Sequence, residues 1–246
     1  MRQFGWNELL FILLALRWTL LLSLVAFAGG IVGGMMIALM KTSTVAPLRW
    51  AATIYVRLFQ GTPLLMQLFL AYYGVTVLTG VRIDPWPAVI IAFTAYAAAF
   101  LGDIWRGCIE AVPREQWEAA EALSLRRLAI MRLVILPQAA RIAIPPTVGF
   151  LVQLIKGTSV ASIIGFVELT RAGQLMTNVT FQPMTIYPLV AGFYFALCWP
   201  LSILSQALEK RMDAAPRDGA DLVKREPPRQ PLGTGASVPD PASGAR

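Results

Sequence analysis

The 246-residue chain is 57% hydrophobic and only 14% charged, a balance far from that of soluble domains. It has no histidine, only two widely separated cysteines (Cys108 and Cys198), and no G-x-x-x-x-G-K-[ST] phosphate loop. These absences exclude a thiolate metal site and ATP binding by that loop. Its net charge of +7 follows membrane topology, as described below, and gives no case for nucleic-acid binding. We expect an integral membrane protein with no metal, no cofactor and no catalytic residue.

Five apolar stretches approach or exceed the roughly 20 residues needed to cross a bilayer of about 30 Å. Because lipid offers no partners to backbone N–H and C=O groups, each stretch is predicted to be a helix. The predicted spans lie near residues 18–40, 58–80, 86–102, 142–167 and 187–208. The predicted fold is an all-α integral membrane protein with five transmembrane helices, in a domain covering residues 1–211.

The distribution of Lys and Arg predicts the orientation of these spans. Sixteen basic residues fall on the side of the loop at 114–137 and the C-terminus, four fall on the other side, and Lys156 lies within a span. Cytoplasmic segments carry the excess of Lys and Arg. We therefore predict that the N-terminus lies outside and that the loop and the C-terminus lie in the cytoplasm.

The first predicted span contains two overlapping pairs of glycines spaced four residues apart. Gly29 pairs with Gly33 and Gly30 with Gly34, which favours close approach of another helix, although glycine is also common in membrane helices generally. Ala26-Phe27-Ala28 imitates a signal-peptide cleavage site. Because the apolar run continues to Met40, we expect an uncleaved helix.

The second predicted span begins with Gly61-Thr62-Pro63, which should loosen the helix because Pro63 has no N–H and crowds the preceding turn. Gln67 is polar within this span. Such a residue faces either a polar pathway or a hydrogen-bonding partner on another helix, and both alternatives remain open here. At the end of the third span, Asp103 and Arg106 are three residues apart, a spacing that favours an ion pair on one helix face.

The segment from Arg114 to Pro137 is polar but contains no glycine, and its residues favour helix. Pro113 suits a helix start, and Glu115 and Glu118 follow where acidic residues favour an N-terminus. A charged helical hairpin between spans indicates either a solvated loop or a docking surface for a soluble partner.

Lys156 is the most unusual residue of the fourth span, within Lys156-Gly157-Thr158-Ser159. A lysine near the middle of a span costs about 2.5–3.5 kcal/mol on insertion scales. It is tolerated beside a watery cavity, beside a partner, or where it reaches the interface. Beyond this span, the segment from Glu168 to Pro183 should lie outside, and residues 212–246 have the composition of a disordered cytoplasmic tail.

The hairpin resembles the EAA loop of ABC-importer membrane subunits, whose pattern is EAA, three residues, Gly, nine residues, then I-x-L-P. Glu118-Ala119-Ala120, Ser124 and Val134-Ile135-Leu136-Pro137 occupy these positions. Ser124 stands where Gly is usual, and Gly tolerates a positive φ that Ser adopts poorly. Val134 stands where Ile is usual.

Three further segments resemble polar amino acid permeases. Residues 60–68 are similar to an R-G-T-P-L-L-x-Q-L segment, with Gln60 in place of Arg. Asp103 and Arg106 resemble an acidic–basic pair of that family, and residues 156–160 are similar to its K-x-T-S-L stretch. The resemblance covers residues 6–211 and implies an importer permease in a bacterial inner membrane.

In such importers, a homodimer or heterodimer of permeases docks on separate ABC ATPase subunits, and an extracytoplasmic binding protein delivers the solute. The resemblance implies ATPase coupling through Glu118, Ala119, Ala120, Ser124 and Pro137. We hypothesise that Lys156, Thr158 and Ser159 face the solute pathway, with Gln67 as a further candidate. The motion would be alternating access driven by ATP hydrolysis on the partner.

Two other classes of membrane protein fit the sequence less well. An ion-driven secondary transporter would need coupling carboxylates within its spans, but Asp103 and Glu110 lie only at the edge of one. A membrane-embedded enzyme would need a nucleophile and base, and the missing histidines remove most such arrangements. The sequence favours a transport subunit.

Overall fold

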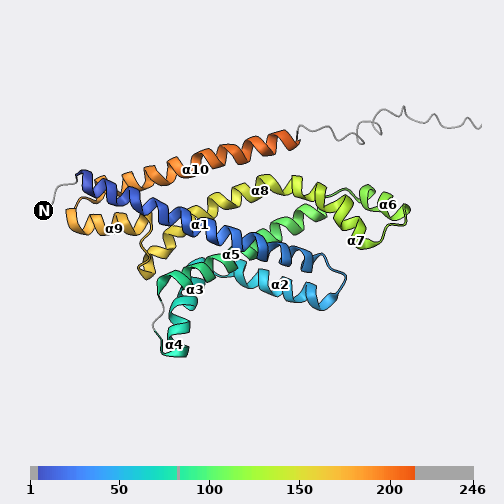
Figure 1. Cartoon of the computed structure of the whole chain (residues 1–246), viewed down its shortest axis with the longest axis horizontal. Helices are drawn as coiled ribbons and strands as arrows, with labels where there is room; N and C mark the ends of the chain where they lie inside the picture. Colours follow the sequence, from blue (N-terminus) through green and yellow to red (C-terminus); the bar gives the residue numbers. More distant parts are fainter. Residues whose placement is uncertain (1–4, 82–83, 214–246) are drawn as a thin grey trace, which may run out of the picture. The chain divides into compact units, whose positions relative to one another are not determined.

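The computed structural model describes residues 5–81 and 84–213, and every regular element in these ranges is a helix. The long helices are α1 (Trp6–Lys41), α5 (Pro85–Glu110), α8 (Leu136–Gly157) and α10 (Pro183–Asp213). Figure 1 shows them with the shorter elements that connect them. The shorter ones are α2 (Ala46–Gly61), α3 (Leu64–Phe69), the π-helix η1 (Leu70–Gly74), α4 (Val75–Thr79), α6 (Arg114–Ala122), α7 (Arg127–Ala129), the π-helix η2 (Ile130–Ile135), the 3-10 helix η3 (Thr158–Ile164) and α9 (Leu169–Thr180).

Within the described residues, four continuous helical segments are long and apolar enough to cross a membrane, and the bent pair α2 and α3–α4 makes five if it counts as one span. The all-α membrane fold is therefore confirmed. Each continuous helix exceeds its predicted span. The 36 residues of α1 extend about 54 Å at 1.5 Å per residue, well beyond the roughly 30 Å of a hydrocarbon core.

Small residues bring α1 and α5 into close contact. A Cβ added to Gly30 would lie 2.5 Å from the Ala97 Cβ, and one added to Gly34 would lie 2.8 Å from the Leu101 Cβ. Real Cβ atoms do not approach so closely, so glycine is required at both positions. The predicted close packing around these glycines is confirmed, and its partner is the alanine-rich part of α5.

The predicted span at 58–80 is not one straight helix. The chain bends by 104° between α2 and the α3–α4 segment, and Pro63 stands at the N-cap of α3 with an extended backbone (φ −61°, ψ 138°). Proline disfavours a helical conformation in the residue before it, here Thr62, which ends α2. The sequence predicted only a loosened helix at Gly61-Thr62-Pro63. The structure has a complete break between two helices there.

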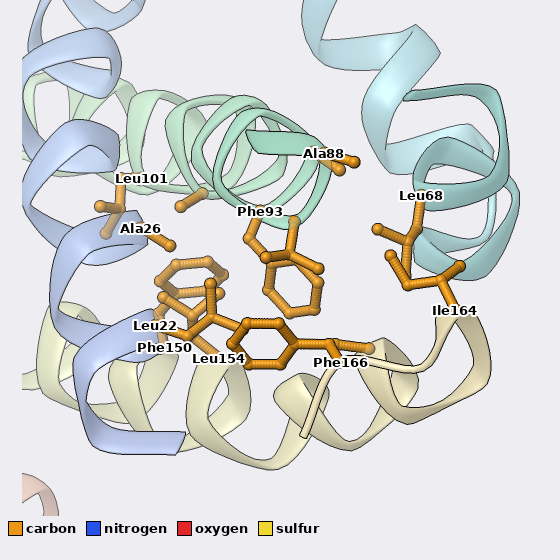
Figure 2. Close-up of a cluster of buried hydrophobic side chains, with 14 residues drawn as sticks. Leu22, Ala26, Leu68, Ala88, Phe93, Leu101, Phe150, Leu154, Ile164 and Phe166 are labelled. Atoms are coloured by element: carbon orange, nitrogen blue, oxygen red, sulfur yellow. The ribbon is translucent and has the colours of Figure 1, made fainter. Parts of the chain in front are cut away.

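The main hydrophobic core joins α1, α3, α5, α8 and η3 through fourteen buried residues. Figure 2 shows the rings of Phe93, Phe150 and Phe166 gathered in this cluster, with Leu68 of α3 facing Ile164 of η3. A polar contact also joins α5 to α8, where the Trp105 Nε1–H donates to the Thr147 hydroxyl at 2.8 Å. These contacts fix the broken span and α8 on the central helix α5.

The helix that carries the fourth span begins inside the predicted hairpin. Residues Arg127–Ile164 run as one long apolar segment through α7, η2, α8 and η3, so the second arm of the hairpin continues directly into a span. The predicted tail at 212–246 lies outside the described residues, apart from the end of α10.

Candidate functional site

The hairpin turns at Ser124, whose φ of +56° lies in the left-handed region. The Ser124 N–H donates to the Glu121 carbonyl at 2.8 Å, and the Leu125 N–H donates to the Ala120 carbonyl at 3.4 Å. This pair of bonds forms a Schellman motif, in which the left-handed residue is usually glycine. Ser124 therefore ends α6 and makes the bend, despite the cost of a side chain there.

The three residues of the EAA motif do not share one environment. Glu118 and Ala119 are exposed, whereas Ala120 is 97% buried in a small core with Val112, Ile130 and others. Ala120 thus holds α6 against η2 within the chain. Glu118 and Ala119 lie on the exposed surface of α6.

Pro137 is the second residue of α8, which begins where the π-helix η2 ends. Because proline has no N–H, it cannot donate to the carbonyl of Leu133, and a widened helix accommodates this missing bond. The side chain of Gln138 then ties the two arms together, since its amide donates to the Val134 carbonyl at 2.9 Å and to the Gln116 side chain at 3.3 Å. The hairpin is a braced unit rather than a loose loop.

An ionic cluster joins the ends of α1 and α5. The Lys41 ammonium contacts the Asp103 carboxylate at 2.6 Å, and the Arg106 Nε lies 3.0 Å from the same oxygen. Arg106 also pairs with Glu110. The predicted Asp103–Arg106 pair is confirmed. Lys41 of α1 joins it by pairing with the same carboxylate.

Gln67 lies at the break in the second span. Its side-chain amide donates to the carbonyls of Phe59 (2.7 Å) and Thr62 (3.0 Å), which are backbone acceptors that the break leaves free. Its side-chain oxygen is buried and has no hydrogen-bond partner in the described residues. Gln67 also borders an apolar cavity of about 560 Å³. These bonds stabilise the break between α2 and α3. Of the two roles expected for Gln67, they correspond to hydrogen bonding with another helix.

A second, more polar cavity of about 280 Å³ lies where α8, η3, α9 and α10 meet. We call it the Lys156 cavity, and it is lined by Lys156, Ser159, Thr170, Tyr187, Val190, Ala191 and Tyr194. Lys156 is exposed to it, and no ion pair of Lys156 occurs within residues 5–81 and 84–213. The Ser159 hydroxyl donates to the Lys156 carbonyl at 2.8 Å.

Thr158, the third polar residue of this stretch, does not line the cavity. Its side chain is fully buried, and its hydroxyl donates to the Ile155 carbonyl at 2.7 Å. The turn from α8 into η3 points Thr158 into the chain and leaves Lys156 and Ser159 at the cavity. The structure therefore brings together two of these three residues and separates both from Gln67, which lines another cavity.

Sequence reasoning missed Glu168, which is completely buried beside the Lys156 cavity. Its carboxylate accepts the backbone N–H groups of Thr170 (2.9 Å) and Arg171 (2.8 Å) and the Tyr194 hydroxyl (2.7 Å). Burial raises the pKa of Glu168 above its usual range, although these donors favour the charged form. An acidic residue before a helix start signals a cap, but nothing in the sequence pairs it with Tyr194.

These features define a class of protein. A broken span, a cavity lined by a lysine that has no ion pair among the described residues, and a braced hairpin with an exposed acidic residue suit a membrane transport subunit that works with a soluble partner. The residues lining the Lys156 cavity offer hydrogen bonds and one positive charge, which can bind an anionic group.

Comparison with known families agrees with this class. The family model described as "Binding-protein-dependent transport system inner membrane component" matches residues 30–214. The chain belongs to this family. It is a multi-pass permease subunit of an inner membrane, not an enzyme, and the alternative of an ion-driven secondary transporter is not supported.

Curated relatives match most of the chain. A probable amino-acid ABC transporter permease of Bacillus subtilis, YckA, is 36% identical over 201 residues, covering 82% of this chain and 88% of that protein. The L-cystine transport system permease TcyB of the same organism is 37% identical over 197 residues, covering 80% and 84%.

Solved structures give the same result. The crystal structure of an amino acid ABC transporter with histidines has a TM-score of 0.79 and 33% identity, covering 83% of this chain and 95% of that one. An inward-facing methionine ABC transporter, MetNI, has a TM-score of 0.67 at 20% identity, covering 83% and 99%, and supports the fold alone.

Proposed function

We propose that this chain is the permease of an ABC importer for polar amino acids and that it moves its solute by alternating access. The observation that carries the proposal is similarity over four fifths of the chain to amino-acid permeases, including TcyB, which is named for L-cystine. The partners would be ABC ATPase subunits, a second permease, identical or homologous, and an extracytoplasmic amino-acid-binding protein.

The hairpin is the proposed ATPase contact. Glu118 and Ala119 are exposed on α6, and Ala120, Ser124 and Pro137 support the bend and its junction with α8. Because residues 127–164 continue as one helical segment, a displacement of the hairpin would move the residues of η3 as well. ATP-driven closure of the ATPase pair would thereby shift the population between two access states.

The Lys156 cavity is the proposed solute contact within this chain. Lys156 supplies a positive charge within a span, and Ser159 and Tyr194 supply hydroxyl groups. An ammonium within a span that has no ion-pair partner among the described residues is costly, so a carboxylate-bearing solute would be stabilised there. The proposed orientation has the N-terminus outside and the hairpin and C-terminus in the cytoplasm, in agreement with the sixteen-to-four distribution of basic residues.

The decisive experiment is co-purification followed by reconstitution. We expect the chain to purify with an ATPase subunit and to take up radiolabelled L-glutamine, L-cystine or L-histidine into proteoliposomes only when ATP and the binding protein are present. Uptake without the ATPase subunit, driven by an ion gradient, would instead identify a secondary transporter.

A further inference from the structure

The Glu168 carboxylate joins two residues of the Lys156 cavity that lie on different helices. Tyr194 of α10 donates its hydroxyl hydrogen to Glu168 at 2.7 Å, and Thr170 at the start of α9 donates its backbone N–H to the same oxygen. The hydroxyls of Tyr194 and Thr170 also lie 3.1 Å apart. Both side chains line the cavity, whereas Glu168 itself is fully covered.

A helix cap alone does not account for this arrangement. Capping α9 requires one side-chain oxygen near two backbone N–H groups, which an exposed Ser, Thr or Asp provides at no desolvation cost. Complete burial of a carboxylate is expensive unless its oxygens are all hydrogen-bonded. The third donor, Tyr194, comes from a helix 26 residues further along the chain and connects the cap to the cavity wall.

The start of α9 is held on its other side as well. The Leu169 N–H donates to the Thr19 hydroxyl of α1 at 3.1 Å. Further along α9, a Cβ on Gly173 would lie 2.7 Å from the Val190 side chain, so α9 and α10 are in close contact. The part of α9 that borders the cavity is therefore fixed to α1 and α10 on both sides.

We propose that Glu168 is a positioning residue for solute binding: it holds the Tyr194 ring and the start of α9 so that the Lys156 cavity has a preset shape for a polar amino acid. This inference rests on the proposed function. Glu168 does not touch the solute and acts through Tyr194. A preset wall lowers the ordering cost of binding, so its loss should weaken solute binding.

Two substitutions remove this connection in different ways. Tyr194→Phe keeps the ring but removes the hydroxyl that bonds Glu168. Glu168→Gln keeps the shape, but each side-chain oxygen of Glu168 accepts a backbone N–H, so an amide N–H₂ group at either position loses one of these bonds. Thr180→Val is the matched control, because it removes a buried hydroxyl of α9 whose two bonds, to the Met176 carbonyl and from the Gln182 N–H, are local to the end of that helix.

The experiment uses Ala191→Cys as a reporter in the full chain, because Ala191 lines the Lys156 cavity and is not a proposed solute contact, with the buried Cys108 and Cys198 replaced by alanine. The rate at which maleimide labels this cysteine reports access to the cavity. Protection by L-glutamine, L-cystine or L-histidine reports solute binding directly, without the ATPase or the binding protein. We expect Tyr194→Phe and Glu168→Gln each to raise both the labelling rate and the half-protective concentration about three- to tenfold.

The double variant should exceed the larger single effect by little, since both changes act on the same connection between the start of α9 and Tyr194. Thr180→Val should stay within about twofold of the parent. Unchanged labelling and protection in both variants, or equal changes in Thr180→Val, would show that Glu168 only stabilises the fold. If no amino acid protects the parent chain, the proposed solute class fails, and the labelling rates still decide the positioning role. Should Glu168→Gln fail to fold, the maleimide labelling rate of the milder Tyr194→Phe variant decides the positioning role.

Discussion

Ser124 occupies a backbone conformation that normally requires glycine. A left-handed conformation costs a residue with a side chain about 1–2 kcal/mol, while glycine loses roughly 0.4–1 kcal/mol more entropy on folding. Ser124→Gly should therefore raise the free energy of unfolding by about 0.5–1 kcal/mol. Thermal unfolding of the purified protein measures this, with Ala122→Gly in the last turn of α6 as the opposite control, expected to destabilise by about 1 kcal/mol. A destabilised Ser124→Gly protein would contradict the strain argument.

Lys156 is an exposed cation within a span, and the proposed solute contact depends on its charge. Lys156→Met should raise the half-protective concentration of the imported amino acid at least about tenfold, since a charge-assisted hydrogen bond contributes roughly 1.5–3 kcal/mol. Lys156→Arg keeps the charge and should retain part of the affinity. Unchanged uptake and unchanged amino-acid preference in Lys156→Met would remove this residue from the pathway.

The buried carboxyl of Glu168 should make stability depend on pH. Burial raises the pKa of Glu168 in the folded state, so the folded protein binds the proton more tightly than the unfolded chain does. The corresponding stabilisation is complete below the unfolded pKa and is lost as the pH rises through the folded pKa. Relative to Glu168→Gln, which cannot titrate, the wild-type protein should gain unfolding free energy as the pH falls from 7 toward the usual carboxyl pKa. A constant difference between the two across this range would refute the shift.

The sequence predicted the contacts of side chains best where residues close in the sequence determine those contacts. The three-residue spacing indicated the Asp103–Arg106 pair. The EAA spacing aligned Ser124 with the usual glycine, but the change from Gly to Ser did not predict the left-handed conformation that the structure has there. The orientations of Thr158 and Ser159 could not be predicted, because spans are apolar on most sides and carry little information about which face is buried. The bond from Tyr194 to Glu168 joins distant helices, and no sequence period encodes it.

At the scale of helices, the α1–α5 pair depends on the absence of side chains at the contact. Gly30→Val would place a Cβ within 2.5 Å of the Ala97 Cβ and 3.2 Å of its backbone, so α1 must move away from α5. Overpacking of this kind typically costs about 1–3 kcal/mol, which should lower the thermal midpoint and the yield of folded protein. Gly192→Ala on α10 is the control, because no atom lies within 4 Å of its added Cβ. Equal stability of the two variants would mean that the contact contributes little.

The sequence predicted the positions of the breaks between helices only in part. Gly61-Thr62-Pro63 predicts that a helix weakens, because proline removes a donor and restricts the residue before it. The size of the bend, 104°, depends on how α3 packs against α5 and η3, as the contact of Leu68 with the main core indicates. Likewise, the helix-favouring residues of 114–137 predicted a helical hairpin, but its continuity with α8 required the structure.

At the scale of the whole described chain, the proposed mechanism requires that a displacement of the hairpin also displaces the residues that line the Lys156 cavity. The second arm of the hairpin runs from Arg127 through to Ile164, and Lys156 and Ser159 lie near its far end. Bracing by Gln138 and the buried Ala120 keeps the first arm fixed to the second. A movement applied to α6 therefore has a continuous helical route to the cavity, and the exposed face of α6 is where it would enter.

Glu118 on that exposed face tests the coupling. Glu118→Lys reverses the charge without disturbing the buried core, since Glu118 is exposed and Ala120 carries the packing. We expect the variant to fold and the amino acid to protect its Ala191→Cys reporter normally, while ATP-driven uptake falls at least about tenfold, as loss of a charge-assisted contact predicts. Glu209→Lys near the end of α10 is the control, with the same charge change on an exposed residue outside the hairpin. Normal ATP-driven uptake in Glu118→Lys would mean that α6 does not dock on the ATPase through this residue.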